Sequence, residues 1–208
     1  MKKILLLVCF AITTLYVNGQ EQKMTASEIA VFTNVSASAS AIRTLKADFI
    51  QYKHMSFLSK DIETSGKIIF KEPDVLQWQY KKPYNYSILF RKGKILINDE
   101  GKKSAMDAGS SKIFTKINKL IVGTVNGDLF DEKEFSISYF KTALQNGARL
   151  VPRDAAIKKY IKTIELLFDK DDATVSQVKL IESAEDYTRI LFKNKVLNAK
   201  IDDTTFIN

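Results

Sequence analysis

The strongest constraint on the fold of this chain is a strict alternation of apolar and polar residues from position 76 to position 81. Successive side chains of an extended strand point to opposite faces of a sheet, so alternation gathers the apolar residues on one face. The apolar face carries Leu76, Trp78 and Tyr80, and the polar face carries Gln77, Gln79 and Lys81. This pattern predicts an antiparallel sheet with one buried face and one face in water.

Segments with the same period of two recur along most of the chain. Turns between them are expected at Lys92-Gly93, at residues 145–147 and at Asn194. The further expected strands cover residues 48–53, 66–71, 83–91, 94–98, 135–139, 148–152, 160–169, 175–182, 186–193 and 195–201. A sheet of about ten antiparallel strands normally curls into a barrel or half-barrel. The sequence therefore predicts a mainly β fold, in a single domain of residues 20–208.

Two segments instead show the three- and four-residue spacing of an amphipathic helix. The first covers residues 27–40, with Ser27 as the expected N-cap. The second covers residues 110–121 and is followed by Gly123, a residue that favours helix C-termini. The apolar residues are Ile29, Phe32 and Val35 in the first helix, and Ile113, Phe114, Ile117, Leu120 and Ile121 in the second.

The N-terminus has the three parts of a secretory signal peptide. Lys2 and Lys3 precede an apolar run at residues 4–12, and the small Gly19 suits a cleavage that leaves Gln20 as the first residue. The run is shorter than the roughly 20 residues that a membrane-spanning helix needs. We therefore expect residues 1–19 to be removed and the mature chain to be exported.

The residue types that most catalytic and metal sites require are scarce. Cys9 is the only cysteine and lies inside the expected signal, so the mature chain has neither disulfide nor thiol chemistry. Lipid anchoring through Cys9 is disfavoured, because Val8 stands where a lipoprotein signal usually has a small residue. A single histidine, His54, does not make a multi-histidine metal site, and the acidic run at residues 169–172 lacks the spacing of a calcium loop. The sequence predicts no enzymatic activity, no cofactor and no metal.

The net charge of +8 is spread along the chain, where lysines alternate with acidic residues. An arginine-rich cluster interleaved with aromatic residues, as in many nucleic-acid-binding proteins, is missing from the sequence. We expect a soluble monomer with a solvated lysine-rich surface that does not bind nucleic acid.

Several short motifs follow one another in a recognisable order. They are Asp48-Phe49-x-Gln51, Gly66-x-Ile68-x-Phe70-x-x-Pro73, Trp78-x-Tyr80-x-x-Pro83 and Gly93. Their order and spacing resemble the N-terminal half of the LolA-like lipoprotein carrier proteins. The later strands, with Phe192 and Phe206, are similar to the C-terminal half of that family. The resemblance covers residues 24–207.

The resemblance implies an unclosed antiparallel β-barrel with α-helices as a lid over an apolar concave cavity. Members of the family bind the acyl chains of lipoproteins released by an inner-membrane transporter. They cross the periplasm and pass their cargo to an outer-membrane acceptor. No cofactor, metal or covalent step is involved, so the resemblance implies a carrier rather than an enzyme.

The same resemblance assigns roles to residues of this chain. The acyl-chain cavity is expected to be lined by Ile68, Phe70, Leu76, Trp78, Tyr80, Tyr86, Ile88 and Phe90, and the lid to carry Ile113, Ile117, Leu120 and Ile121. Apolar residues in such strands are more often ordinary core than ligand pocket. The open barrel changes this expectation, because its concave face has no second sheet to pack against.

Glu72 is a departure from the family at the expected mouth of the cavity. The well-studied members have an arginine directly before the proline that corresponds to Pro73, and that arginine is linked to closure of the lid. Lys71 is the nearest basic residue, but strand alternation places it on the opposite face from Phe70. How a lid would close beside Glu72 is therefore left open.

Two other functions are compatible with the same sequence. A related half-barrel that carries a glycolipid or a fatty acid would have the same strands and the same apolar face. A structural or regulatory exported domain would instead have a concave face that packs on itself.

Overall fold

The computed structural model describes residues 21–38, 42–107, 131–171 and 174–206. Its elements are β1 (Gln22–Lys23), α1 (Ala26–Ser38), β2 (Thr44–His54), β3 (Ile62–Lys71), β4 (Val75–Lys82), β5 (Tyr86–Arg91), β6 (Lys94–Asp99), β7 (Lys102–Asp107), β8 (Phe135–Lys141), β9 (Gln145–Pro152), α3 (Ala155–Lys158), β10 (Thr163–Asp169), β11 (Val175–Ile181), β12 (Tyr187–Leu197) and the 3-10 helix η3 (Asp203–Thr205). The expected signal peptide and the expected helix at residues 110–121 lie outside the described residues.

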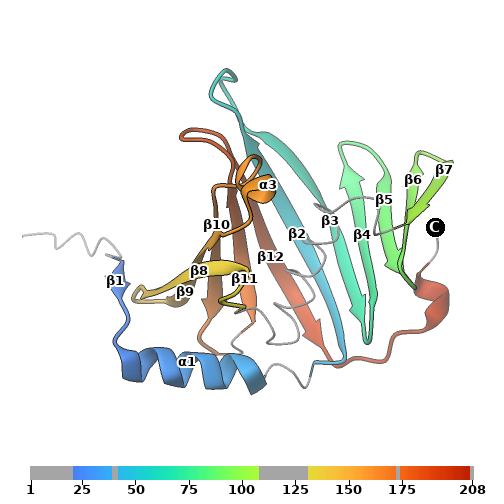
Figure 1. Cartoon of the computed structure of the whole chain (residues 1–208). Helices are drawn as coiled ribbons and strands as arrows, with labels where there is room; N and C mark the ends of the chain where they lie inside the picture. The colour runs from blue at the N-terminus through green and yellow to red at the C-terminus, as the bar shows by residue number, and fades with distance from the viewer. Residues whose placement is uncertain (1–20, 39–41, 108–130, 172–173, 207–208) are drawn as a thin grey trace, which may run out of the picture.

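All the described strands belong to one antiparallel sheet in the order β1-β8-β9-β10-β11-β12-β2-β3-β4-β5-β6-β7. Because β1 and β7 stand at opposite ends of this order, the sheet is not closed. It curves strongly, and α1 runs across one end of it, below β8 to β11 (Figure 1). The expected half-barrel is confirmed.

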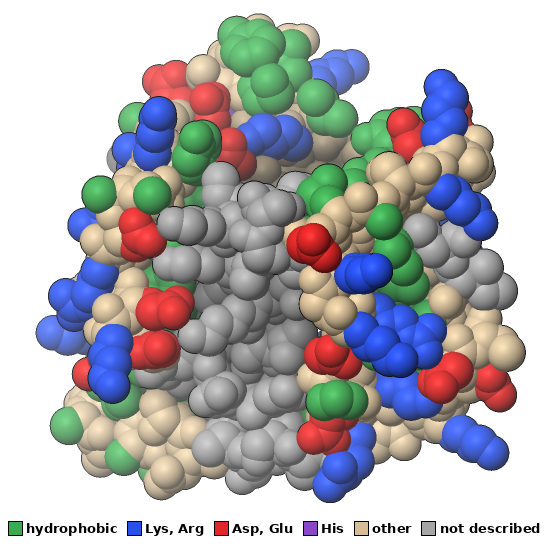
Figure 2. Space-filling view, turned by 45° about the vertical axis from the view of Figure 1, so that its right-hand side comes forward, with side chains coloured by type: hydrophobic (Ala, Val, Ile, Leu, Met, Phe, Trp, Pro, Cys, Tyr) green, Lys and Arg blue, Asp and Glu red, His purple; other side chains and the backbone are tan. Residues whose placement is uncertain are grey.

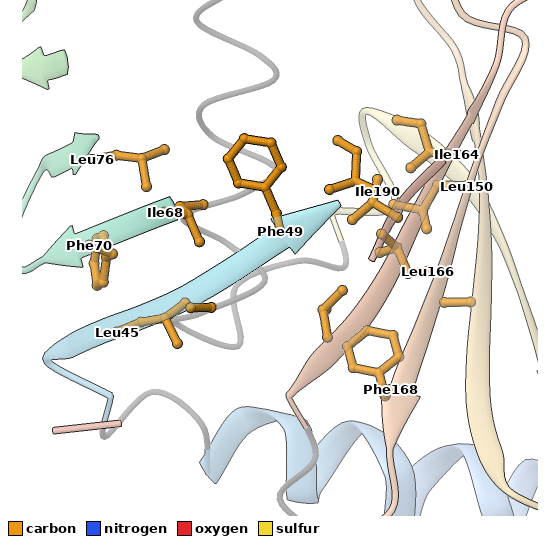
Figure 3. Packing of buried hydrophobic residues seen from close by; sticks show 14 of the residues in the cluster. Leu45, Phe49, Ile68, Phe70, Leu76, Leu150, Ile164, Leu166, Phe168 and Ile190 are labelled. Carbon is orange, nitrogen blue, oxygen red and sulfur yellow. The ribbon is translucent and has the colours of Figure 1, made fainter. Parts of the chain in front are cut away.

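The alternation that predicts the strands also decides which side chains are buried. Along β2, Leu45, Ala47 and Phe49 are buried, whereas Lys46 and Asp48 between them are half-buried. Phe49 comes from the middle of the sheet and faces Leu150, Ile164, Leu166 and Ile190 of the other half (Figure 3). The main apolar cluster thus lies on the concave face and draws on both halves of the sheet.

The helix α1 closes one end of this cluster through Phe32. The Phe32 ring lies edge-on to Tyr139 and Phe168, with centroid distances of 6.0 and 5.0 Å. Val35, expected on the same buried stripe, is 49% exposed, so the stripe is narrower than the sequence predicts. The prediction of Ser27 as the N-cap is also wrong. Thr25 and Glu28 form a capping box instead, in which the Thr25 amide donates to Glu28 Oε2 at 2.9 Å.

The convex face of β3 to β6 is covered by the C-terminal segment. Ile201 and Phe206 pack on Ile69 and Leu89 in a second, smaller cluster. Gln77, which lies between these two strand residues in register, is fully buried. The prediction of a wet face at Gln77 is wrong, because the C-terminal segment takes the place of solvent over this part of the sheet.

Three further details differ from the sequence prediction. Asn194 does not end a strand: β12 continues through it, with a register shift between Lys193 and Val196 on the pairing with β2. Residues 145–147 belong to β9, and the turn before them is at residues 142–144. The strand expected from Tyr160 begins only at Thr163, after the short helix α3 at residues 155–158.

Acidic and basic side chains are interspersed over the part of the surface shown in Figure 2. Many of them pair, as Arg149 does with Glu165, at 2.8 Å between Nε and Oε1. This matches the dispersed charge expected from the sequence.

Candidate functional site

The expected cavity residues of β3, β4 and β5 form cross-strand rows on the concave face. Antiparallel pairing places residues directly opposite each other on the same face of the sheet. The rows are Phe70–Leu76–Phe90, Ile68–Trp78–Ile88 and Tyr80–Tyr86. All eight side chains therefore share one face, which extends across three strands.

Burial differs along these rows. Phe70 and Leu76 are fully buried, and Ile68, Trp78 and Phe90 are nearly so. Tyr80 and Ile88 are partly buried and pack against the same cluster. The side chains of this face are thus closely packed around Leu76, whereas those near the β4–β5 turn are accessible to solvent.

The structure adds residues that the family motifs did not single out as cavity-lining. Phe49 on β2 lies edge-on to Tyr80 at 5.1 Å, and Phe192 on β12 is 6.1 Å from Trp78, both between ring centroids. The opposite wall is made by Ile164, Leu166 and Phe168 of β10, all fully buried. Their signal is present in the sequence, as alternation within the strand expected at residues 160–169.

Tyr80 is the polar member of the otherwise apolar rows. Its hydroxyl donates to Gln51 Oε1 at 3.3 Å. Burial raises the pKa of Tyr80 to about 12, because the charged phenolate is poorly solvated there. The side chain therefore stays neutral at physiological pH and adds no charge to the face.

A groove of about 580 Å3 lies beside α1, at the end of the sheet that this helix crosses. Met24, Val31 and Phe32 line its apolar side, and Lys141 and Asp169 stand at its margin. Lys141 is ion-paired with Glu28 of α1, and this hydrogen-bonded pair lowers the pKa of Glu28 to about 2. The helix is thus tied to β8 by a charge pair as well as by the Phe32 ring.

Glu72 stands in the turn between β3 and β4 and has a basic partner. Arg43 Nη1 lies 2.8 Å from Glu72 Oε2, and the Glu72 amide donates to the Arg43 carbonyl at 2.8 Å. Lys71 points to the convex face, where Nζ contacts Asp203 Oδ1 at 2.5 Å, as strand alternation predicts. A positive charge therefore stands beside Glu72, supplied by Arg43. The role of Glu72 at a cavity mouth stays a prediction, and the lid residues 113–121 lie outside the described part of the chain.

Among the described residues, no group of three or more histidine, cysteine, aspartate or glutamate side chains is arranged to hold a metal ion. In the same part of the chain, no helix is long and apolar enough to cross a bilayer.

The family described as outer membrane lipoprotein carrier protein LolA matches residues 40–207. This chain belongs to the LolA family. None of the curated proteins matches the chain.

Solved structures share the fold of this chain at low sequence identity. A structure of MucB is 11% identical with a TM-score of 0.53, and covers 88% of this chain and 63% of its own. The complex of MucA and MucB from Pseudomonas aeruginosa is 10% identical with a TM-score of 0.50, covering 87% and 61%. A conserved protein from Thermus thermophilus is 6% identical with a TM-score of 0.53, covering 85% and 91%. The chain thus spans less than two thirds of the MucB chains, and at these identities the likeness concerns the fold alone.

Proposed function

We propose that this LolA-family protein is a periplasmic carrier that holds the acyl chains of lipoproteins against its concave face and moves them from the inner to the outer membrane. The observation that supports the proposal is the row arrangement on β3, β4 and β5. It gives a single apolar surface across three strands of an unclosed sheet. The family is named for the same activity.

The energetics of acyl-chain burial suit a carrier with partial enclosure. Burying one methylene from water stabilises a complex by ~0.8 kcal/mol, so about 15 methylenes contribute ~12 kcal/mol. Three such chains, fully enclosed, would exceed the ~18–21 kcal/mol at which non-covalent affinities saturate. In a carrier that releases its cargo, the acyl chains therefore move between the membrane and the protein surface. The apolar free energies of the chains in these two environments nearly cancel. An unclosed sheet suits this exchange, because its edges leave the concave face accessible.

The proposed route needs partners on both membranes. A signal peptide at residues 1–19 brings the chain to the periplasm, an inner-membrane lipoprotein-releasing transporter loads it, and an outer-membrane acceptor unloads it. The protein acts as a monomer and without catalysis, cofactor or metal. In this route the ion pair of Glu72 with Arg43 takes the place of the arginine that other members have before the proline.

The bound lipid itself distinguishes the proposal from a carrier of glycolipids or fatty acids. The full chain with its signal is expressed in a bacterium with a periplasm, purified without detergent, and examined by native mass spectrometry and lipid analysis. We expect acylated lipoproteins or their diacylglyceryl peptides. Recovery of glycolipid or free fatty acid alone would favour the other carrier function, and protein recovered always empty would favour a purely structural domain.

A further inference from the structure

The concave face changes character along the strands. On β2, the buried Leu45, Ala47 and Phe49 are followed on the same face by Gln51 and Lys53. The polar residues come last, toward the hairpin that joins β2 to β3. The apolar face therefore ends in a polar region at the side of the sheet opposite α1 (Figure 1).

The neighbouring strands carry polar side chains near the same end of the concave face. Thr64 of β3 lies directly opposite Gln51, and Thr188 of β12 lies directly opposite Lys53. Tyr80 of β4 reaches Gln51 with its hydroxyl. Polar side chains thus lie on four adjacent strands near this end of the concave face, although the β12 residue directly opposite Gln51 is the apolar Ile190.

Thr64 is the distinctive member of these polar side chains. It is only 7% exposed, and its Oγ1 has no hydrogen-bond partner within the described part of the chain. A buried hydroxyl without a partner destabilises a protein, so such groups normally have a partner of some kind. Thr64 shares the concave face with Ile68, so its side chain lies on the same side of the sheet as the apolar rows. A ligand that lay along the concave face would meet Thr64 and Tyr80 at the point where the surface turns polar.

We infer that Thr64, together with Gln51 and Tyr80, forms a subsite for the ester carbonyl groups of a diacylglyceryl lipid whose acyl chains lie over the apolar rows. The inference rests on the proposed function and adds an orientation to it. An ester carbonyl accepts hydrogen bonds and donates none, and the Thr64 hydroxyl is a donor at the boundary between apolar and polar surface. The head of the lipid then points to the β2–β3 hairpin, and its chain ends point toward α1.

The dimensions agree with this orientation. Six residues separate Thr64 from Phe70 along β3, and at roughly 3.3 Å per residue this distance is about 20 Å. An extended palmitoyl chain has a similar length. The carbonyl at Thr64 and the end of the chain near Phe70 and Leu76 are therefore compatible in one lipid.

The test compares two synthetic lipopeptides that differ only at the carbonyl. One is an S-(dipalmitoylglyceryl)cysteine peptide with ester links, and the other is the matching dialkyl ether, which lacks both carbonyls. Their affinities for the full mature chain are measured by displacement of a fluorescent fatty acid. We expect the wild-type protein to bind the ester about two- to tenfold more tightly, as one neutral hydrogen bond allows. Thr64→Val keeps the shape and removes the hydroxyl, and it should bind both peptides equally, with unchanged affinity for the ether.

Matched variants complete the test. Ser65→Ala removes the hydroxyl of the next residue, on the convex face, and should keep the wild-type preference for the ester. Tyr80→Phe should reduce that preference.

Equal affinities in the wild-type protein, or a preference that survives Thr64→Val, would overturn the subsite while leaving acyl-chain binding intact. Failure of the wild-type protein to bind either peptide would overturn the proposed function as well. A short-chain diacyl phosphatidylcholine that competes equally would assign the subsite to acylglycerol esters in general, and one that does not compete would assign it to the lipidated cysteine.

Discussion

Phe49 lies edge-on to Trp78, with ring centroids 4.9 Å apart and ring planes at 65°, although the two residues belong to strands separated by β3. The residue of β3 opposite Phe49 is Gly66. Because Gly66 has no side chain, the Phe49 ring reaches across β3 to the aromatic residues of β4. This contact joins the β2 and β4 parts of the concave face into one surface.

Gly66 should therefore tolerate no side chain. A Cβ atom at this position would lie 1.8 Å from the carbonyl oxygen of Gln79 on β4, and backbone cannot move aside as a flexible side chain can. We expect Gly66→Ala to lower the free energy of unfolding by about 3 kcal/mol or more, as forced overpacking does. Urea denaturation measures the effect, and Ser65→Ala in the same strand, expected to change stability by less than about 0.5 kcal/mol, is the control. An alanine variant as stable as the wild type would mean that β3 and β4 do not approach each other so closely.

The C-terminal segment should contribute to stability from the convex side. Phe206 is 6% exposed and packs with Ile201 over Ile69 and Leu89. Phe206→Ala removes this ring and exposes the neighbouring surface to water, so we expect a loss of about 3 kcal/mol in the free energy of unfolding. Lipid affinity of the folded variant, measured by the same fluorescent displacement, should stay within about twofold of the wild type, because the concave face is on the other side. A large loss of affinity in a folded variant would show that the two faces are coupled.

The pair of Glu28 and Lys141 should make the attachment of α1 sensitive to acid. Hydrogen bonding to Lys141 and to Thr25 lowers the pKa of Glu28 from 4.5 to about 2 in the folded protein. A carboxyl with a lowered folded-state pKa stabilises the fold above its unfolded pKa, and this contribution is lost as the pH falls through the folded-state value. The stability difference between the wild type and Glu28→Gln should therefore be constant above about pH 5 and shrink between pH 4.5 and 2. Urea denaturation over that range measures it, and a difference independent of pH would contradict the pairing.

Much of the fold follows from local pattern, and the departures have identifiable causes. The alternation of Leu76, Trp78 and Tyr80 predicts their common face correctly, because strand geometry alone fixes the direction of successive side chains. The burial of Gln77 was not predictable in this way. It depends on Ile201 and Phe206, far later in the chain, which fold back over β4.

The candidate site shows the same division between local and distant information. Its apolar rows could be predicted from strands adjacent in the sequence. The contact of Trp78 with Phe192 depends on pairing of β2 with β12, the first long strand with the last. The partner of Glu72 is similarly distant, since Arg43 precedes β2 and no short motif joins the two residues.

The apolar rows themselves are tested most directly by matched substitutions on the two faces of the sheet. Ile88 lies on the concave face, partly buried between Trp78 and Ile97. Ile50 is also a half-buried isoleucine, on the convex face of β2. Ile88→Gln puts an amide under the proposed acyl chains, and burying it there without a partner costs roughly 1–3 kcal/mol. Ile50→Gln makes the same change in chemistry on the other face.

The decisive measurement is transfer of a radiolabelled lipoprotein from inner-membrane vesicles to a soluble complex with the purified mature protein, with circular dichroism to verify that each variant is folded. We expect the wild type and Ile50→Gln to extract the lipoprotein equally. Extraction by Ile88→Gln should be lower by a factor of at least about five, because a cost of roughly 1–3 kcal/mol for burying the amide reduces the affinity by that factor or more. Equal extraction by folded Ile88→Gln and Ile50→Gln variants, or no extraction by the wild-type protein, would contradict acyl-chain binding on the concave face.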